Sequence, residues 1–258
     1  MNDGEKDELI VQIKLIQLKF AASEIEMLGE IQHVGFDDDY VQLPPDFRLS
    51  SLSSFSDSQL VNFGDSLGIS KSGPFNKADT FINGIGVSLK SNKKAPPALV
   101  NHTTRPGFEF AAMHSGGDID ALDKMIYDYL DLRKAGIIGQ DIKNSHHHSP
   151  FALNKLVLEP FLNFFLFDGT GSRLSKKPAE FILSFTDPLD TETWSLYDKS
   201  NAMDRYWDKL IFSLRAKNMP AGYPNVSDQI LHKKPSIDKW TEFIDSKYKG
   251  TLHIRSGH

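Results

Sequence analysis

The sequence predicts a mixed α/β protein, in which helices flank a central β-sheet that contains both parallel and antiparallel strands. Three observations support this fold class. Apolar residues recur at helical spacing in residues 5–31 and 118–134. Short runs rich in β-branched and aromatic residues lie between turn signals. The 258 residues, 40% of them hydrophobic and 24% charged, are enough to bury a full core.

The N-terminal part is expected to be helical. Residues 5–31 carry a broad apolar stripe that predicts one long helix, which Gly35 ends. A serine-rich loop follows, in which Ser56 or Asp57 can cap a short helix that runs to Phe63.

Residues 80–90 predict a β-hairpin. The apolar run 80–82 leads into Asn83-Gly84, the strongest short signal of a tight hairpin turn, because both residues tolerate positive φ. The return run is Ile85 to Lys90.

Alternation along the return run separates its side chains into two sets. Val87 and Leu89 are expected to point into a core, whereas Ser88 and Lys90 look outward together. Asp79 immediately precedes the hairpin, so the tight turn brings this acid beside the amine of Lys90. A carboxylate can hold a divalent cation, and a lysine can orient water next to a phosphate. The hairpin therefore predicts metal-dependent chemistry on a phosphate.

The second half supplies further helices and strands. An amphipathic helix is expected over 118–134, with Gly136 ending it, and the apolar stretch 151–167 is expected in the core. Three short strands are expected in the last third, at 180–185, 209–215 and 251–255.

The hairpin also carries a family resemblance. Lys77-Ala78-Asp79 followed by Gly86-Val87-Ser88-Leu89-Lys90 resembles the PD-(D/E)xK nuclease motif, in the form found in many type II restriction endonucleases. Ala78 stands where the motif has Pro, and Ser88 stands where it has an acid. The resemblance implies a restriction-endonuclease-like fold and Mg²⁺-dependent hydrolysis of double-stranded DNA at a short recognition sequence, leaving 5′-phosphates.

The resemblance implies catalytic roles for Asp79, Ser88 and Lys90, and it requires a second acid because Ser88 replaces the strand carboxylate. Glu109 is the nearest acid after Lys90, and it is expected to hold Mg²⁺ together with Asp79 while Lys90 positions the attacking water. The competing suppliers of the second acid are Glu24, Glu26 and Glu30.

Basic and polar side chains after the hairpin are expected to contact DNA. Lysines meet phosphates, and arginine and asparagine commonly read base edges. The net charge of −5 does not favour non-specific coating of nucleic acid, but a nuclease that binds DNA in a cleft needs only one basic face. The candidates are Lys93, Lys94, Asn101, His102 and Arg105.

The expected organisation is a single domain, residues 1–258, with a catalytic core in about 1–135 and a DNA-recognition lobe in about 136–258. The resemblance implies a homodimer, since a palindromic target mirrors a two-fold axis. The chain has no cysteine, which excludes disulfides and thiolate zinc sites, and it shows no signal peptide or membrane span. A cytoplasmic location is therefore expected.

Two other functions remain open. A DNA-binding or defence-associated module that lost the metal site would bind DNA without cleaving it, which Ser88 would permit. The run Phe63-Gly64-Asp65-Ser66-Leu67 resembles the Gly-Asp-Ser-Leu box of an esterase and lipase family, with Ser66 as nucleophile. That family needs an apolar strand before the box and a late Asp-x-x-His, and this chain has neither in the required form, so the box is interpreted as a helix end.

Overall fold

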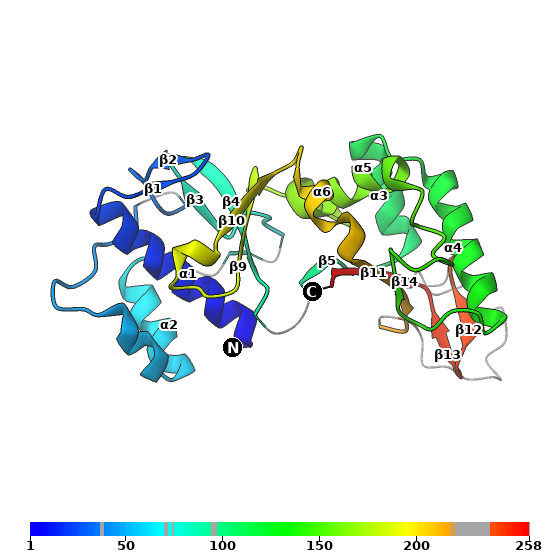
Figure 1. Cartoon of the computed structure of the whole chain (residues 1–258), viewed down its shortest axis with the longest axis horizontal. Helices are drawn as coiled ribbons and strands as arrows, with labels where there is room; N and C mark the ends of the chain where they lie inside the picture. The colour runs from blue at the N-terminus through cyan, green and yellow to red at the C-terminus, as the bar shows by residue number, and fades with distance from the viewer. Residues whose placement is uncertain are drawn as a thin grey trace. The chain divides into compact units, whose positions relative to one another are not determined.

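The computed structural model describes residues 1–36, 39–69, 72, 73, 75–93, 97–217, 219 and 238–257. The chain divides into two compact units, which are Met1–Ala95 with Ser175–Ala202 and Pro96–Leu174 with Met203–His258 (Figure 1). The boundary expected near residue 135 falls inside the second unit, directly after helix α4 (Ile119–Lys134). Both units combine helices with sheets, so the expected mixed α/β class is confirmed.

The first unit is built on a mixed four-stranded sheet with the strand order β10-β9-β4-β3. β4 and β9 run parallel, and the other neighbouring pairs are antiparallel. The strands are β3 (Thr80–Ile82), β4 (Ile85–Ser91), β9 (Phe181–Phe185) and β10 (Ser195–Asp198). The other elements of this unit are α1 (Asp3–Phe20), β1 (Glu24–Ile25), β2 (Gly29–Glu30), η1 (Leu49–Ser54), α2 (Asp57–Ser66) and η3 (Thr191–Thr193).

The single long helix predicted for residues 5–31 is wrong, because α1 ends at Phe20. The N–H of Ala21 bonds back to helical carbonyls, and Ala22 turns the chain away with a φ of 49°. The chain then forms the short β1–β2 hairpin, which still buries Leu28 and places Ile31 in the core directly after it. Glu24, Glu26 and Glu30, expected on the first helix, therefore lie on this hairpin.

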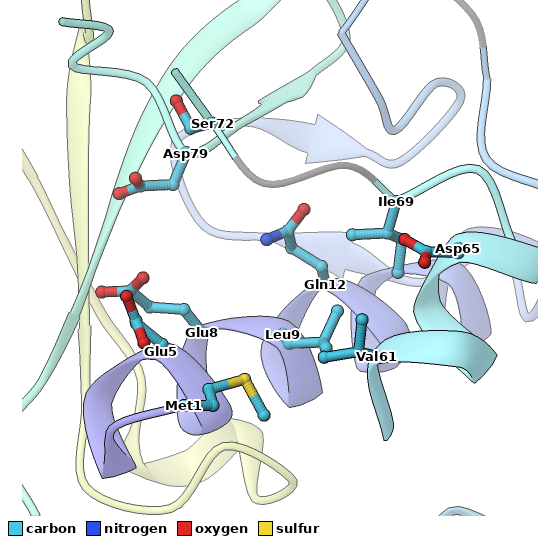
Figure 2. Close-up of a pocket in the computed structure, with 10 residues that line it drawn as sticks. All are labelled: Met1, Glu5, Glu8, Leu9, Gln12, Val61, Asp65, Ile69, Ser72 and Asp79. Atoms are coloured by element: carbon cyan, nitrogen blue, oxygen red, sulfur yellow. The ribbon is translucent and has the colours of Figure 1, made fainter. Parts of the chain in front are cut away.

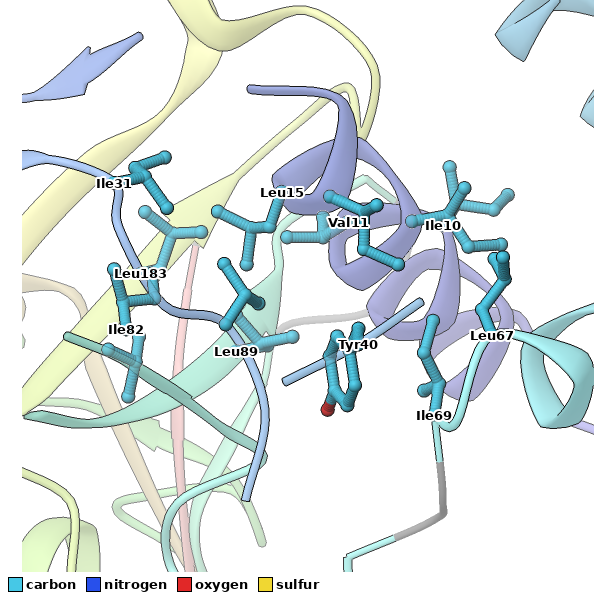
Figure 3. Close-up of a cluster of buried hydrophobic side chains, with 14 of the residues drawn as sticks. Ile10, Val11, Leu15, Ile31, Tyr40, Leu67, Ile69, Ile82, Leu89 and Leu183 are labelled. Atoms are coloured by element: carbon cyan, nitrogen blue, oxygen red, sulfur yellow. The ribbon is translucent and has the colours of Figure 1, made fainter. Parts of the chain in front are cut away.

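The core of the first unit lies where α1 packs against the sheet (Figure 3). Val11 and Leu15 of α1 are fully buried, and they share a cluster with Val87, Leu89 and Leu183 of the sheet. Burying each aliphatic side chain of this size contributes roughly 1.5–3 kcal/mol. The prediction that Val87 and Leu89 face a core is confirmed.

The predicted hairpin is confirmed as β3 and β4. Its turn residues Asn83 and Gly84 have φ values of 53° and 81°, as the Asn-Gly signal requires. Gly86 follows on β4, where an added Cβ would lie 2.3 Å from the carbonyl oxygen of Pro178. This position therefore has no room for a side chain.

The second unit contains an antiparallel sheet with the strand order β5-β14-β11-β6. These strands are β5 (Ala98–Thr103), β6 (Ile142–Lys143), β11 (Leu210–Arg215) and β14 (Thr251–Ser256). Two small hairpins pair β7 (Gly169–Thr170) with β8 (Arg173–Leu174) and β12 (Glu242–Ile244) with β13 (Lys247–Lys249). The helices are α3 (Arg105–Ser115), α4, α5 (Lys155–Asn163), η2 (Phe164–Asp168) and η4 (Trp207–Lys209), and α6 (Ala202–Tyr206) begins at the boundary between the units.

Most expected elements of the later chain are confirmed. β9, β11 and β14 match the three predicted strands, and α4 matches the predicted helix, with Asp118 capping its first N–H groups. The stretch 151–167 forms α5 and the π-helical turn η2, and its phenylalanines are buried as expected. None of the helices in the described ranges is long and apolar enough to cross a membrane.

Candidate functional site

Asp79 is held by the backbone and the side chains of the neighbouring strand β4. Its N–H donates to the carbonyl of Val87, and its Oδ2 accepts the N–H of Leu89 at 2.8 Å and the hydroxyl of Ser88 at 3.2 Å. Leu89 lies two residues beyond the last register pair of β3 and β4, so the carboxylate replaces the missing strand partner. Neither of these bonds uses Oδ1. Asp79 and Ser88 are thus in direct contact.

Ser88 does not look outward as expected, because it is only 2% exposed. Its hydroxyl is satisfied by Asp79. Lys90 lies one strand period further along the same face of β4 and is half-buried. Within the described part of the chain, its amine makes no hydrogen bond or ion pair, so the structure does not show it joined to Asp79, the acid beside which the sequence placed it.

Asp79 also lines a pocket of about 400 Å³ in the first unit (Figure 2). In the view of Figure 2, Glu5 and Glu8 rise from α1 below Asp79, and Asp65 lies on the far side at the end of α2. Four carboxylates therefore share one pocket, whereas Ser88 and Lys90 are not among its lining residues. The polar lining side chains are Glu5, Glu8, Gln12, Asp65, Ser72 and Asp79.

Two of the lining residues have visible structural roles. Glu5 completes the capping box of α1, because its carboxylate accepts the N–H of Asn2 at 3.0 Å. Gln12 accepts the hydroxyl of Tyr40 at 2.8 Å, and that hydroxyl lies 3.3 Å from Thr80 Oγ1. Burial raises the pKa of Tyr40 and the negative charge of Asp79 adds to the rise, so Tyr40 remains a neutral donor.

The pocket offers the oxygen donors that hard divalent cations prefer. Within the described ranges, however, no three His, Cys, Asp or Glu side chains lie close enough together to form a ready-made metal site. Mg²⁺ is usually bound through only one or two carboxylates, with water and phosphate oxygens completing its shell. The donor set therefore fits Mg²⁺ bound together with a phosphate better than a closed structural metal site.

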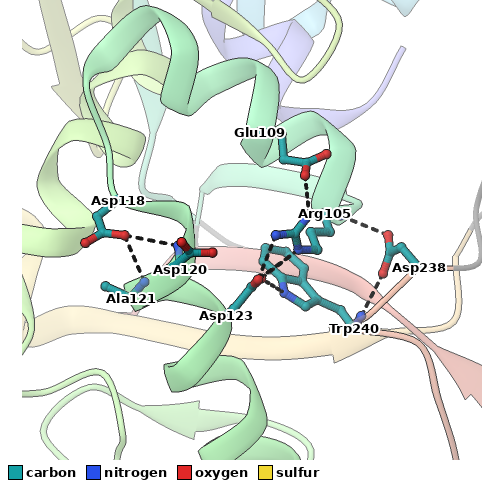
Figure 4. A network of polar contacts seen from close by, with 8 residues as sticks. All are labelled: Arg105, Glu109, Asp118, Asp120, Ala121, Asp123, Asp238 and Trp240. Carbon is teal, nitrogen blue, oxygen red and sulfur yellow. Dashed lines mark hydrogen bonds and ion pairs between the residues drawn. The ribbon is translucent and has the colours of Figure 1, made fainter.

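Glu109, the expected second metal ligand, belongs to the second unit and lies on α3. Its carboxylate forms an ion pair with Arg105, one helical turn earlier (Figure 4). Its side chain remains 46% exposed. The structure thus gives Glu109 a local partner for its charge.

Arg105 was expected to contact DNA, but the structure places it in a buried network. It is 7% exposed, and its guanidinium donates to both oxygens of Asp123 as well as to Glu109. These acidic partners raise the pKa of Arg105, chiefly through the hydrogen bond to Asp123. Each of its three nitrogens donates to a carboxylate, so the buried guanidinium is not placed to read a base.

The other expected DNA contacts differ in their surroundings. Lys93 is half-exposed, 4.0 Å from a carboxylate oxygen of Asp7, and Asn101 is exposed on β5. His102 is half-buried, and its ring stacks on that of His253 with centroids 4.4 Å apart. Lys94 lies outside the described residues.

Ser66 is the last residue of α2, which confirms the interpretation of the Gly-Asp-Ser-Leu box as a helix end. Its hydroxyl donates to the carbonyl of Phe63 in the same helix at 2.7 Å. No strand-to-helix turn positions this serine as a nucleophile.

The sequence-based reasoning missed Glu8, Gln12 and Asp65 as neighbours of Asp79. A signal for two of them was present, since Glu5, Glu8 and Gln12 follow one another at spacings of three and four and so form a polar stripe on α1.

Comparison of the chain with family models, with curated proteins and with solved structures finds no match. The function must therefore be inferred from these residues.

Proposed function

We propose that the protein is a Mg²⁺-dependent, site-specific nuclease that hydrolyses phosphodiester bonds of double-stranded DNA and leaves 5′-phosphates, with its site at the hairpin of the first unit. The observation that carries this proposal is the position of Asp79. Its carboxylate is fixed by β4 through Oδ2 and lines a pocket that holds three further acids. The motif resemblance at Asp79, Ser88 and Lys90 supports the same assignment.

The charge of the pocket favours a cation. Four carboxylates would repel a phosphate, so a phosphodiester can approach Asp79 only when a cation offsets their charge. Asp79 and Glu8 are the residues we assign to hold Mg²⁺, because both line the pocket and Glu8 lies below Asp79 in Figure 2. Glu109 remains the alternative second ligand.

Each side chain then has a distinct role. Bound Mg²⁺ would stabilise the charge that develops on the phosphate oxygens. Ser88 fixes the orientation of Asp79 through its hydrogen bond. Lys90, whose amine makes no hydrogen bond or ion pair within the described residues, orients the attacking water. A homodimer would place one such site on each strand of a palindromic target.

The test is cleavage of a mixed plasmid and phage DNA substrate with and without Mg²⁺. We would compare the wild type with Asp79→Asn, which keeps an acceptor for Leu89 N–H, and with Lys90→Gln. Asp128→Asn, an exposed residue of α4, is the matched control for removal of a charge. Discrete fragments that require Mg²⁺ and disappear only in the first two variants are expected.

The same assay separates the two alternatives. A binding module would retard specific DNA fragments in a gel at any Mg²⁺ concentration and cleave none. An esterase would lose activity toward an ester substrate in Ser66→Ala and keep it in Asp79→Asn. DNA cleavage that survives both Asp79→Asn and Lys90→Gln would refute the placement of the site at the hairpin.

A further inference from the structure

A second pocket, of about 350 Å³, lies wholly within the second unit and is rich in cations. It lies where the end of β11 meets the hairpin β12–β13 and the β5 residue His102. Four of its lining residues are basic, and one is acidic. The charged lining residues are Arg215, Lys217, Asp245, Lys247 and Lys249.

The acids Asp141 and Asp245 do not balance the basic side chains in and around this pocket, because each pairs with two of them. Asp141 pairs with Arg215 at 2.5 Å and with Arg255 at 2.8 Å. Asp245 pairs with Arg133 at 2.6 Å and also with Lys249. These paired side chains therefore carry more positive than negative charge.

Lys217 and Lys247 add to that excess. Both are exposed pocket residues, and within the part of the chain that the structure describes neither forms an ion pair. By contrast, Lys249 is 5% exposed and also donates to Gln140 at 2.8 Å, which fixes a cation in the pocket wall. The pocket thus combines a buried ammonium with two exposed ones and the planar guanidinium of Arg215.

His102 lies in the same positive field. Burial lowers its pKa, and the neighbouring His253, Lys217 and Arg215 lower it further, to about 4. Its Nδ1 is buried and makes no hydrogen bond with any described residue. An imidazole that is held neutral by nearby cations gains its proton more easily once an anion binds among them.

We propose that this pocket binds a phosphate group. Several ammonium groups and one guanidinium around a small concave site match the charge and the several oxygens of a phosphate better than they match a single carboxylate. The phosphate would come either from a nucleic-acid backbone or from a free phosphate ester. The proposal does not depend on the hairpin site, since every residue of the pocket belongs to the second unit.

The test removes the two lysines that form no ion pair with any described residue, Lys217→Gln with Lys247→Gln, so that no carboxylate in the described ranges loses a partner. The matched control is Lys124→Gln with Lys209→Gln, two exposed lysines of the same unit outside the pocket. Thermal unfolding must coincide for all three proteins. Binding is measured in EDTA with a fluorescent 20-base-pair DNA duplex and, separately, with inorganic phosphate.

If the phosphate belongs to nucleic acid, the pocket variant binds the duplex about 10-fold more weakly than the wild type does. The slope of log K against log salt concentration becomes shallower by about 2 in that variant, while the control keeps the wild-type affinity and slope. If it belongs to a free ester, inorganic phosphate raises the pKa of His102 in the wild type and the control but not in the pocket variant, as followed by NMR. The proposal is overturned if the pocket variant matches the control with both probes. Because no Mg²⁺ is present, failure of the nuclease proposal would leave these results unchanged.

Discussion

Replacing Asp123 by alanine would remove the centre of the buried network in the second unit (Figure 4). Asp123 accepts Arg105 Nε and Nη2 through its two oxygens, each at 2.7 Å, and Trp240 Nε1 at 2.7 Å. Burial raises the pKa of this carboxyl, but the hydrogen bonds from Arg105 and Trp240 outweigh it and lower the pKa overall. The carboxylate is therefore charged at neutral pH, and it joins α4 to α3 and to the Trp240 segment.

The cost follows from what the substitution leaves behind. A buried ion pair that loses one partner destabilises a protein by about 3–5 kcal/mol, and Glu109 still offsets part of the Arg105 charge, so we take about 3 kcal/mol. The indole N–H of the fully buried Trp240 loses its acceptor, which adds about 1 kcal/mol. The expected loss is about 4 kcal/mol, a large share of the roughly 5–15 kcal/mol of a typical domain.

Urea unfolding at pH 7, followed by tryptophan fluorescence, measures this loss. Asp128→Ala, an exposed acid on the same helix, should stay within about 0.5 kcal/mol of the wild type. Replacing Arg105 by Met together with Asp123 by Leu should recover part of the loss, because no unpaired charge then remains buried. An Asp123→Ala protein that loses no more than the Asp128→Ala control would refute the reasoning.

Three further predictions concern the rest of the chain. Glu8→Gln should lower Mg²⁺-dependent DNA cleavage at least about 100-fold while Glu109→Gln leaves it nearly unchanged; the opposite result would restore Glu109 as the metal ligand. Gly86→Ala should lower stability in urea by about 2 kcal/mol or more, because its Cβ would meet the Pro178 carbonyl. The folded pKa of His102, about 4, lies below its unfolded value of 6.5, so the unfolded state binds the proton first and stability falls as the pH drops from 6.5 to 4. His102→Asn, which tolerates the φ of 51° there, should make that fall shallower in urea titrations across this range.

The parts of the fold that the sequence predicted are those fixed by local chemistry. Asn83-Gly84 encodes its turn through backbone conformations that few other residues adopt, and the hairpin followed from it. The end of α1 had no such marker, since Ala21 and Ala22 are ordinary helix residues. Apolar residues after them continue the helical spacing although they reach the core from a hairpin. Tertiary packing decided that boundary.

In the candidate site too, contacts between adjacent strands follow from the local sequence, whereas contacts between distant segments do not. The contact between Asp79 and Ser88 follows from the pairing of adjacent strands, although the sequence predicted Lys90, and not Ser88, as the neighbour of Asp79. Glu8 reaches the same pocket only because α1 packs against the sheet, a contact between segments that are distant in sequence. A search for the second acid that proceeds along the chain from Lys90 arrives at Glu109, whose charge is already paired with Arg105.

The remaining question about Asp79 is why the position carries a charge. Accepting the N–H of Leu89 and the hydroxyl of Ser88 requires an oxygen but no negative charge, and the amide oxygen of asparagine would accept both bonds. A carboxylate that shares a pocket with Glu5, Glu8 and Asp65 is repelled by each of them, so its charge is a cost that the strand pairing does not explain. A bound cation would reverse the sign of that interaction. Asp79→Asn should therefore leave the protein as stable as the wild type or more stable in EDTA, and it should abolish any stabilisation by added Mg²⁺.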